Sequence, residues 1–236
     1  MRFLLNVDHI ATLRNARGEE QPDPVTAALI AEQAGIDGIV IHLREDRRHI
    51  TERDVRLLRE LVKTKLDLEM AADEEIIKIA CDVGPELATL VPERREELTT
   101  EGGLNVIDNI PLIKNTIEEL HNAEIDVSLF IEPDLKNIDA AAEMDADFIE
   151  IHTGVFANAE TEAEQFDELE TIRAAVKHAK KLGLGVNAGH GLNYQNIKIF
   201  REVPDIDEVS IGQAVIARAV FVGIKEAVQE MIRLIG

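Results

Sequence analysis

Short apolar segments alternate with longer amphipathic segments along the whole chain. Each gap between the apolar segments is long enough to hold a helix, and the segments have the length and aliphatic content of buried strands. Consecutive strands joined through helices form parallel βαβ units, and eight such units predict an α/β fold of the (β/α)8 TIM barrel type. The predicted strands are residues 3–8, 38–43, 66–71, 87–92, 126–132, 148–154, 185–190 and 208–212.

Helix-start signals stand in several of the gaps. Asp23 precedes Pro24, Thr51 is followed three residues later by Asp54, and Asp134 follows a proline. Side-chain oxygens at such positions accept hydrogen bonds from the first free N–H groups of a helix. The last amphipathic segment, residues 214–235, is predicted to form one helix that closes the chain.

An open, doubly wound sheet is the rival fold. It usually carries a glycine-rich phosphate turn after its first strand, whereas here the first strand leads into NVDHIATLRNARG, residues 6–18. No linker rich in Pro, Gly or Ser divides the chain, so residues 1–236 are expected to form a single barrel domain. The connections 93–106 and 155–166 are longer than turns and are expected to hold additional short helices or lids.

Composition narrows the class of protein. The 46 acidic against 25 basic residues give a net charge of −21, which argues against a nucleic-acid partner. No apolar run has membrane-spanning length, and the N-terminus lacks the layout of a signal peptide, so a cytoplasmic protein without a membrane partner is expected. Cys81 is the one cysteine, which excludes an internal disulfide and a cysteine-based zinc cluster.

Polar side chains gather at the carboxyl ends of the predicted strands, where barrel enzymes place their reacting groups. His42, Glu69 and His190 each interrupt an apolar strand, and burial of an unpaired polar group costs roughly 2–7 kcal/mol. We therefore expect these three to face one another across a cavity as general acid–base groups. Glu150 or His152 taken singly is more simply a hydrogen-bonded core residue. Further strand-end residues are Asn6, Asp8, His9, Arg44 and Asn187.

Two features suit phosphate groups. Glycines in residues 187–191 and 210–212 follow the last two strands, where barrels commonly bind phosphate with backbone N–H groups. A basic element follows the first two strands, and its arginines can hold phosphate through paired hydrogen bonds. Its members are Arg14, Arg17, Arg44 and His49, with hydroxyls of Thr99 and Thr100 as further donors; Arg47 and Arg48 are expected to form salt bridges with Glu45 and Asp46 at a helix start.

Other chemistries stay open at this point. A metal-dependent site like that of class II aldolases could use the same His, Glu and Asp residues, but no H-x-H or H-x-x-x-H pair supports it. Schiff-base catalysis is disfavoured because no lysine lies near the carboxyl end of a predicted strand. A barrel that only binds a phosphorylated metabolite would need the arginines but not the buried acid–base residues.

Several segments together resemble the pyridoxine 5′-phosphate synthase family. They are NVDHIATLRNARG (6–18), HLREDRRHIT (42–51), LEMA (68–71), LVPE (90–93), TTEGG (99–103), SLFIE (128–132), EIHTG (150–154) and NAGHGLNY (187–194). The resemblance implies a (β/α)8 barrel with extra helices, a homo-octamer, and no metal or organic cofactor. The implied reaction joins 1-deoxy-D-xylulose 5-phosphate to 3-amino-2-oxopropyl phosphate and yields pyridoxine 5′-phosphate, phosphate and water.

The resemblance also implies roles for individual residues. The acid–base residues are His42, Glu69 and His190, with Glu150 in support. One departure from the family pattern stands after the last strand, where Gln213 replaces a histidine. The contacts to the amino-ketone phosphate are Asn6, Gly191, Gly212 and Gln213, and those to deoxyxylulose phosphate are Asp8, His9, Arg17, Arg44, His49 and Thr99.

Overall fold

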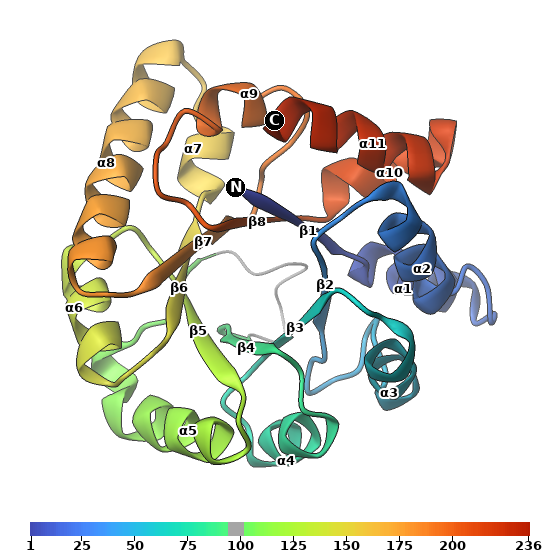
Figure 1. The fold of residues 1–236 in the computed structure, drawn as a ribbon, viewed down its shortest axis with the longest axis horizontal. Helices are drawn as coiled ribbons and strands as arrows, with labels where there is room; N and C mark the ends of the chain where they lie inside the picture. Colours follow the sequence, from blue (N-terminus) through green and yellow to red (C-terminus); the bar gives the residue numbers. More distant parts are fainter. Residues whose placement is uncertain (94–101) are drawn as a thin grey trace.

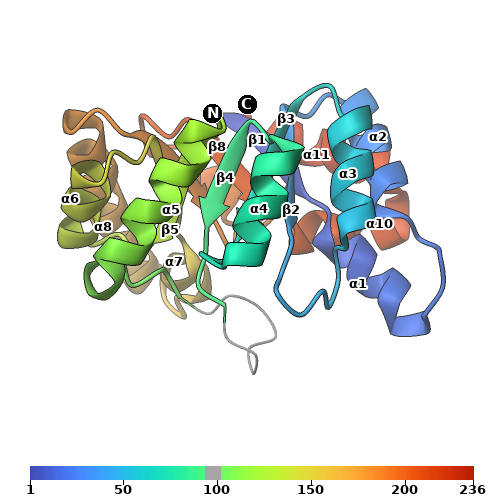
Figure 2. The same cartoon turned by 90° about the horizontal axis from the view of Figure 1, so that it is seen from below.

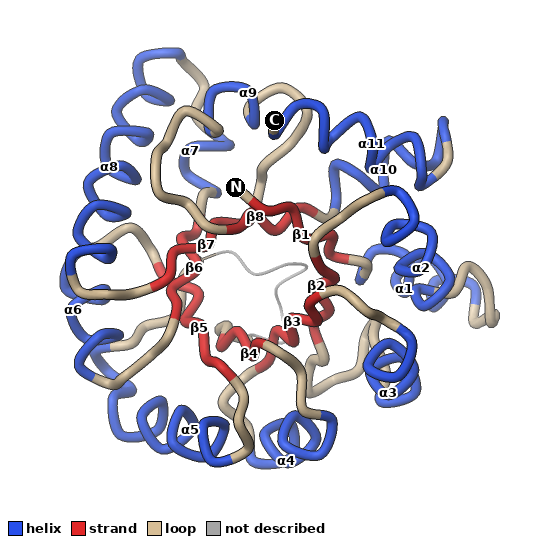
Figure 3. The backbone as a smooth tube through the Cα atoms, in the orientation of Figure 1, coloured by secondary structure: helices blue, strands red, loops and turns tan. Residues whose placement is uncertain are grey.

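A computed structural model of the protein describes residues 1–93 and 102–236. Eight parallel strands form a closed barrel in sequence order, and β1 pairs with β8 to complete it, as the ring of strands in Figure 3 shows. The predicted (β/α)8 barrel is therefore confirmed. The strands are β1 (Arg2–Asn6), β2 (Gly38–His42), β3 (Lys65–Met70), β4 (Leu87–Leu90), β5 (Asp126–Ile131), β6 (Phe148–His152), β7 (Gly185–Gly189) and β8 (Glu208–Ile211).

The helices surround the barrel (Figure 1), and no described helix is long and apolar enough to cross a membrane. The segment 155–166 contains most of the short helix α7, as expected, whereas residues 94–101 of the other long connection lie outside the described residues. The helices are α1 (Asp8–Arg17), α2 (Pro24–Ala34), α3 (Glu52–Leu61), α4 (Glu74–Val83), η1 (Ile107–Asn109), α5 (Ile110–Asn122), α6 (Leu135–Glu143), α7 (Gly154–Asn158), α8 (Glu162–Lys181), α9 (Ile197–Phe200), α10 (Gln213–Val222) and α11 (Ile224–Ile235).

One helix prediction was wrong. The segment 214–235 is not a single helix, because Gly223 adopts φ 83° between α10 and α11. This left-handed conformation is open to glycine and ends the first helix there. The three predicted helix starts are confirmed: Asp23 accepts a hydrogen bond from the N–H of Val25, Thr51 begins α3 with a capping box, and Asp134 caps α6.

The strands carry apolar side chains outward and mainly polar side chains inward. Successive residues of a strand point to opposite faces, so a period of two separates the two environments. Phe3, Leu5, Ile39 and Ile41 belong to the core cluster shared with the helices. All eight strands run in the same direction, so their carboxyl ends lie together at one end of the barrel. Both chain termini lie at the other end (Figure 2). The carboxyl ends of the strands therefore form one polar rim.

Charged groups inside the barrel are paired across it. The ammonium of Lys65 on β3 lies 2.7 Å from Oε2 of Glu208 on β8, and Arg2 reaches the other oxygen of Glu208 at 2.7 Å. Asp67 accepts a hydrogen bond from the hydroxyl of Thr89 at 2.8 Å. Burial raises the pKa of Asp67 to about 7, because no solvent stabilises its charge. A carboxyl beneath the site therefore carries a proton below neutral pH.

The protonation of Asp67 should make stability depend on pH. The pKa of Asp67 is about 7 in the folded state against a usual value of 3.8, so the folded state binds this proton more tightly than the unfolded state does. The free energy of unfolding therefore falls as pH rises from 3.8 to about 7. The difference corresponds to roughly 4 kcal/mol at most. Asp67→Asn should lose less stability than the wild type as pH rises from 3.8 to about 7, measured by urea denaturation.

Asp167→Asn, a change at an exposed position in α8, serves as the matched control and should behave like the wild type. An identical loss of stability in all three proteins would show that Asp67 does not cause the dependence.

Candidate active site

A cavity of about 480 Å³ opens at the carboxyl ends of the strands. Its walls come from β1, β2, β3, β5, β6 and β8 and from residues that follow β1, β2, β4, β7 and β8. The structure thus gathers residues that are up to about 200 positions apart in the chain, as a barrel rim does. The predicted site residues that line the cavity are Asn6, Asp8, His9, His42, Arg44, His49, Glu69, Glu150, His190, Gly191, Gly212 and Gln213.

Of the predicted site residues that the structure describes, Arg17 does not line the cavity. Arg17 is exposed in the last turn of α1, and Thr99, like Thr100, lies outside the described residues. Arg14, which the basic pattern had included, is held by both oxygens of Asp54 at 2.8 and 2.9 Å. This buried ion pair joins α1 to α3, so Arg14 has a structural role and is not available to a ligand.

The flanking arginines are only partly as predicted. Arg48 pairs with Asp46 at 2.6 Å, as expected. Arg47 pairs with Glu52 at 2.9 Å and with Glu75, and it meets only the backbone of Glu45. The segment is a turn and not a helix start, because Arg47 adopts φ 50°.

His42 lies between two carboxylates. Its neighbour in the strand register is Glu69, whose Oε2 is 3.8 Å from Nδ1 of His42, beyond hydrogen-bond distance. On the other side, Nε2 of His42 is 2.8 Å from Oε1 of Glu93. Glu93 was not among the predicted site residues. It follows Pro92 directly after the fourth predicted strand, so the strand-end rule could have found it, but it was assigned to the connection 93–106, which was expected to hold a lid or an additional helix.

Two carboxyls, the half-buried Glu69 and the buried Glu150, face the cavity with altered acidity. Burial, followed by the nearby charges of Glu150, Asp8 and Asp67, raises the pKa of Glu69 well above its usual value. Burial and neighbouring acids likewise raise the pKa of Glu150. Gly189 makes room for this group, because a Cβ there would lie 2.1 Å from Oε1 of Glu150. The site can therefore hold and release protons near neutral pH.

His190 is held in a strained backbone conformation. Its φ is 75°, which is uncommon for a residue with a side chain, and the hydroxyl of Thr153 donates to its carbonyl oxygen at 2.6 Å. Its ring lies 5.0 Å from that of His152, which in turn contacts Glu132 through Nδ1 at 2.7 Å. Burial and the adjacent His152 lower the pKa of His190, so this histidine is neutral at pH 7.

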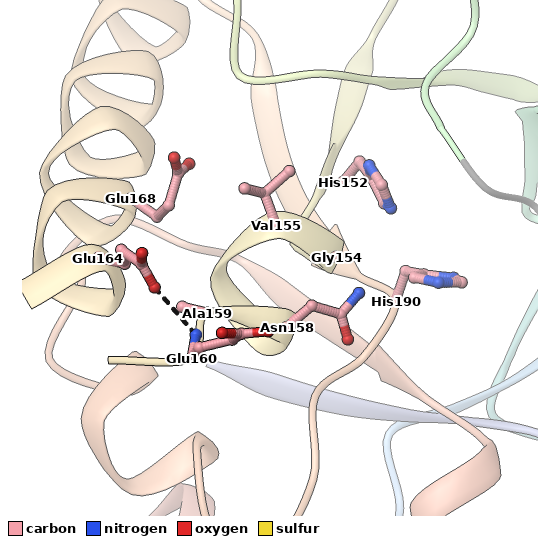
Figure 4. A pocket seen from close by; sticks show the side chains of 9 residues that line it. All are labelled: His152, Gly154, Val155, Asn158, Ala159, Glu160, Glu164, Glu168 and His190. Carbon is pink, nitrogen blue, oxygen red and sulfur yellow. Dashed lines mark hydrogen bonds between the residues drawn. The ribbon is translucent and has the colours of Figure 1, made fainter. Parts of the chain in front are cut away.

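A second pocket of about 410 Å³ lies behind these two histidines, between α7 and α8 (Figure 4). It is lined by His152 and His190 on one side and by Glu160, Glu164 and Glu168 on the other.

Glu132, like Glu93, had no predicted role, although it ends the fifth predicted strand. The structure shows that it orients the imidazole next to His190.

Asn6 and Asp8 brace the floor of the cavity. The Asn6 amide donates to Oδ2 of Asp8 at 3.0 Å, and the Asp8 N–H donates back to Asn6 at 2.8 Å. Oδ1 of Asp8 accepts the N–H of His42 at 2.9 Å. Gly212 lies against Asn6, where a Cβ would approach the Asn6 Cβ to 3.0 Å. This bracket fixes β1, β2 and β8 in the positions from which their side chains reach the cavity.

One group of side chains has metal-site spacing. The ligand atoms of Asp8, His42 and His49 all lie within 4.8 Å of one another. However, Nδ1 of His49 accepts the backbone N–H of Ile50 at 2.9 Å, so its proton resides on Nε2. A nitrogen that carries a proton donates a hydrogen bond and does not ligate a cation. The arrangement therefore favours an anion beside His49.

Comparison with known proteins places the chain. The model of the family "Pyridoxal phosphate biosynthesis protein PdxJ" matches residues 3–236. The chain belongs to this family. PdxJ relatives that carry the name pyridoxine 5′-phosphate synthase are those of Chlorobium phaeobacteroides, 59% identical over 235 residues, and Chlorobium luteolum, 60% identical over 236 residues; both matches cover 100% of each chain. The resemblance seen in the sequence is thereby confirmed.

Solved structures resemble the PdxJ chain in fold alone. KGPDC from Streptococcus mutans superposes with a TM-score of 0.68 at 14% identity, over 99% of this chain and 96% of that one. Thiamine phosphate pyrophosphorylase from Pyrococcus furiosus gives a TM-score of 0.65 at 15% identity, over 99% and 94%. The barrel is thus shared with proteins of different names, and a shared barrel does not by itself indicate a shared function.

The His49 tautomer predicts that this PdxJ protein does not use Asp8, His42 and His49 as a metal site. Added Co²⁺ should produce no visible absorption bands of a His-coordinated ion, and treatment with EDTA should leave turnover unchanged. Bands that appear in the wild type and vanish in His49→Gln would contradict the prediction, as would activity lost with EDTA and restored by a divalent ion.

Proposed function

We propose that the protein is a pyridoxine 5′-phosphate synthase that condenses 1-deoxy-D-xylulose 5-phosphate with 3-amino-2-oxopropyl phosphate. The observation that carries this proposal is the meeting of His42, Glu69 and His190 in one cavity that also holds Arg44 and His49. Proton-transfer groups and an anion clamp in a single site suit a condensation of phosphorylated carbonyl compounds. The names of the relatives support the same reaction.

The two phosphates have different proposed positions. Arg44, 3% exposed, and Nε2–H of His49 would hold the phosphate of deoxyxylulose phosphate, with His9 beside them. Asp8 would contribute to this phosphate site indirectly, through its hydrogen bonds to Asn6 of β1 and to the N–H of His42 of β2. Arg17 is left out of this clamp, because it does not line the cavity of its own chain.

The amino-ketone phosphate would bind at the opposite side of the cavity, against Asn6, Gly191 and the start of α10. The first N–H groups of a helix have no partner within it and point toward an anion at its N-terminus. Gly212 and Gln213 stand at that end of α10 and line the cavity. The Gln213 amide can donate to phosphate without titrating, which accommodates the replacement of histidine there.

The chemistry begins with attack of the amine on the ketone of deoxyxylulose phosphate. Loss of water from the carbinolamine gives an imine and then an enamine, with Glu69 and His42 moving the protons. The amino-ketone provides the ring nitrogen and the carbon that bears the 5′-phosphate, so its phosphate stays. The phosphate group of deoxyxylulose phosphate leaves and water replaces it. Ring closure with dehydration then yields the aromatic ring. His190, neutral and supported by Glu150, would serve these later proton transfers.

Two other functions fit the site less well. A metal-dependent aldolase-type reaction would need Asp8, His42 and His49 as ligands, and the His49 tautomer disfavours that set. A barrel that only binds a phosphorylated metabolite would have no use for carboxyls such as Glu69 and Glu150, whose charges are costly because they are largely removed from solvent and lie near other acids.

We also propose where and with what the protein works. We expect a cytoplasmic protein whose reaction uses no cofactor and which binds neither nucleic acid nor membrane. Self-association as a homo-octamer is expected from the family resemblance. Phe221, 85% exposed on α10, and Val220, 69% exposed, offer apolar surface that a second copy would bury.

The proposed reaction is tested with both substrates, each labelled separately in its phosphate. We expect pyridoxine 5′-phosphate to form together with free phosphate, and the released label to come from deoxyxylulose phosphate alone. Absence of product with a folded protein would remove the proposed function. Label released from the amino-ketone would overturn the assignment of the leaving group.

Glu69→Gln keeps the shape of the side chain but removes the base. We expect turnover to fall by about 10²–10⁴, with Michaelis constants little changed. In the wild type, the raised pKa of Glu69 means that the base is lost as pH falls, so turnover should decline on the acidic side well above pH 4.5. Glu118→Gln, the same change at an exposed position of α5, is the matched control and should leave turnover unchanged. Unchanged turnover in Glu69→Gln would exclude Glu69 from the mechanism.

A further inference from the structure

We propose that Glu93 is a positioning residue that fixes the tautomer and orientation of the His42 imidazole. This inference rests on the proposed function, because it takes His42 as an acid–base group. Glu93 itself is not among the residues that line the main cavity. It acts on the reaction only through His42.

The contact between the two side chains is short and dry. Oε1 of Glu93 lies 2.8 Å from Nε2 of His42, and both side chains are 6% exposed. The second oxygen, Oε2, accepts the backbone N–H of Glu45 at 3.1 Å. Both carboxylate oxygens are therefore used, one on the imidazole and one on the loop that follows β2. The imidazole is also fixed from its backbone, where Asp8 accepts the N–H of His42.

Glu93 remains charged in this setting. Burial by itself would raise its pKa, but the hydrogen bond and charge of His42, the N–H of Glu45 and the nearby Arg44 together lower the pKa of Glu93 below its usual value. An ionised carboxylate only accepts hydrogen bonds. The proton of a neutral His42 must consequently stand on Nε2, toward Glu93.

The other ring nitrogen is then free to accept a proton. Nδ1 of His42 faces Glu69, whose Oε2 is 3.8 Å away, and the gap between them is too wide for a direct hydrogen bond. Both residues line the cavity, so one reacting group of a substrate can contact Nδ1 of His42 and Glu69 together. When Nδ1 takes a proton, the imidazolium keeps its hydrogen bond to the negative charge of Glu93. This is the division of labour between a general base and an orienting carboxylate.

Glu93→Gln separates this role from simple anchoring of the loop. In the amide an NH₂ group replaces one of the two carboxylate oxygens, so only one of the two contacts, with His42 or with the Glu45 N–H, can keep an acceptor. If its oxygen stays with the Glu45 N–H, its NH₂ faces Nε2 of His42 and requires that nitrogen to be unprotonated. The proton then moves to Nδ1, where it blocks the base. The substituted side chain has nearly the same size, so the fold should survive.

The tautomer is read directly from the ¹⁵N shifts of the His42 ring in the substrate-free protein. We expect the Nε2–H form in the wild type and a shift to Nδ1–H in Glu93→Gln. Glu132→Gln, at the equivalent pair with His152, is the matched control and should leave the His42 ring unchanged. A wild-type His42 in the Nδ1–H form would overturn the proposal even if the variant failed to fold.

Steady-state kinetics provide the second readout. Turnover in Glu93→Gln should fall by about 10²–10⁴, while both Michaelis constants stay within about threefold, because Glu93 does not line the substrate cavity. Turnover within about threefold of the wild type, or a loss of turnover with an unchanged His42 tautomer, would overturn the role of Glu93. An inactive wild-type protein would instead count against the proposed function, and the tautomer measurement would still test the link between Glu93 and His42.

Discussion

The structure depends on the alternation of side chains along eight strands that close into a barrel. Every second residue points into a space that solvent reaches only at the rim, so each polar group there must find a partner or change its protonation. Lys65 and Glu208 meet this demand as an ion pair, and Asp67 meets it by retaining a proton. The same constraint at the rim yields carboxyls and imidazoles with altered acidity.

Two carboxylate–histidine pairs show how this constraint is met at the rim of the barrel. Glu93 holds His42, and Glu132 holds His152 beside His190. In both pairs a charged carboxylate determines which ring nitrogen carries the proton. His42 ends β2 and His152 ends β6, on opposite sides of the barrel (Figure 3). Under the proposed function, this arrangement would hold proton donors and acceptors in place before a substrate enters.

Much could be predicted from the sequence because the signals were local. Period-two strands, capping residues and strand spacing determine the eight βα units without any knowledge of distant contacts. The strand-end rule likewise identified His42, Glu69 and His190, since position along a strand decides which side chains reach the rim. The single helix predicted over 214–235 failed at Gly223 because an isolated glycine does not disclose its φ angle.

Only the tertiary structure decided which polar residues line the cavity and which form contacts away from it. Arg14 and Arg17 stand in one basic run, yet the fold pairs Arg14 with Asp54 and leaves Arg17 at the surface. The partnership of Glu93 with His42 spans 51 residues, and no local pattern records it. Amino-acid order therefore determined the barrel and the identity of its rim residues. Charge, proton position and partner were set by distances between strands, because electrostatic interactions depend on separation in space and not along the chain.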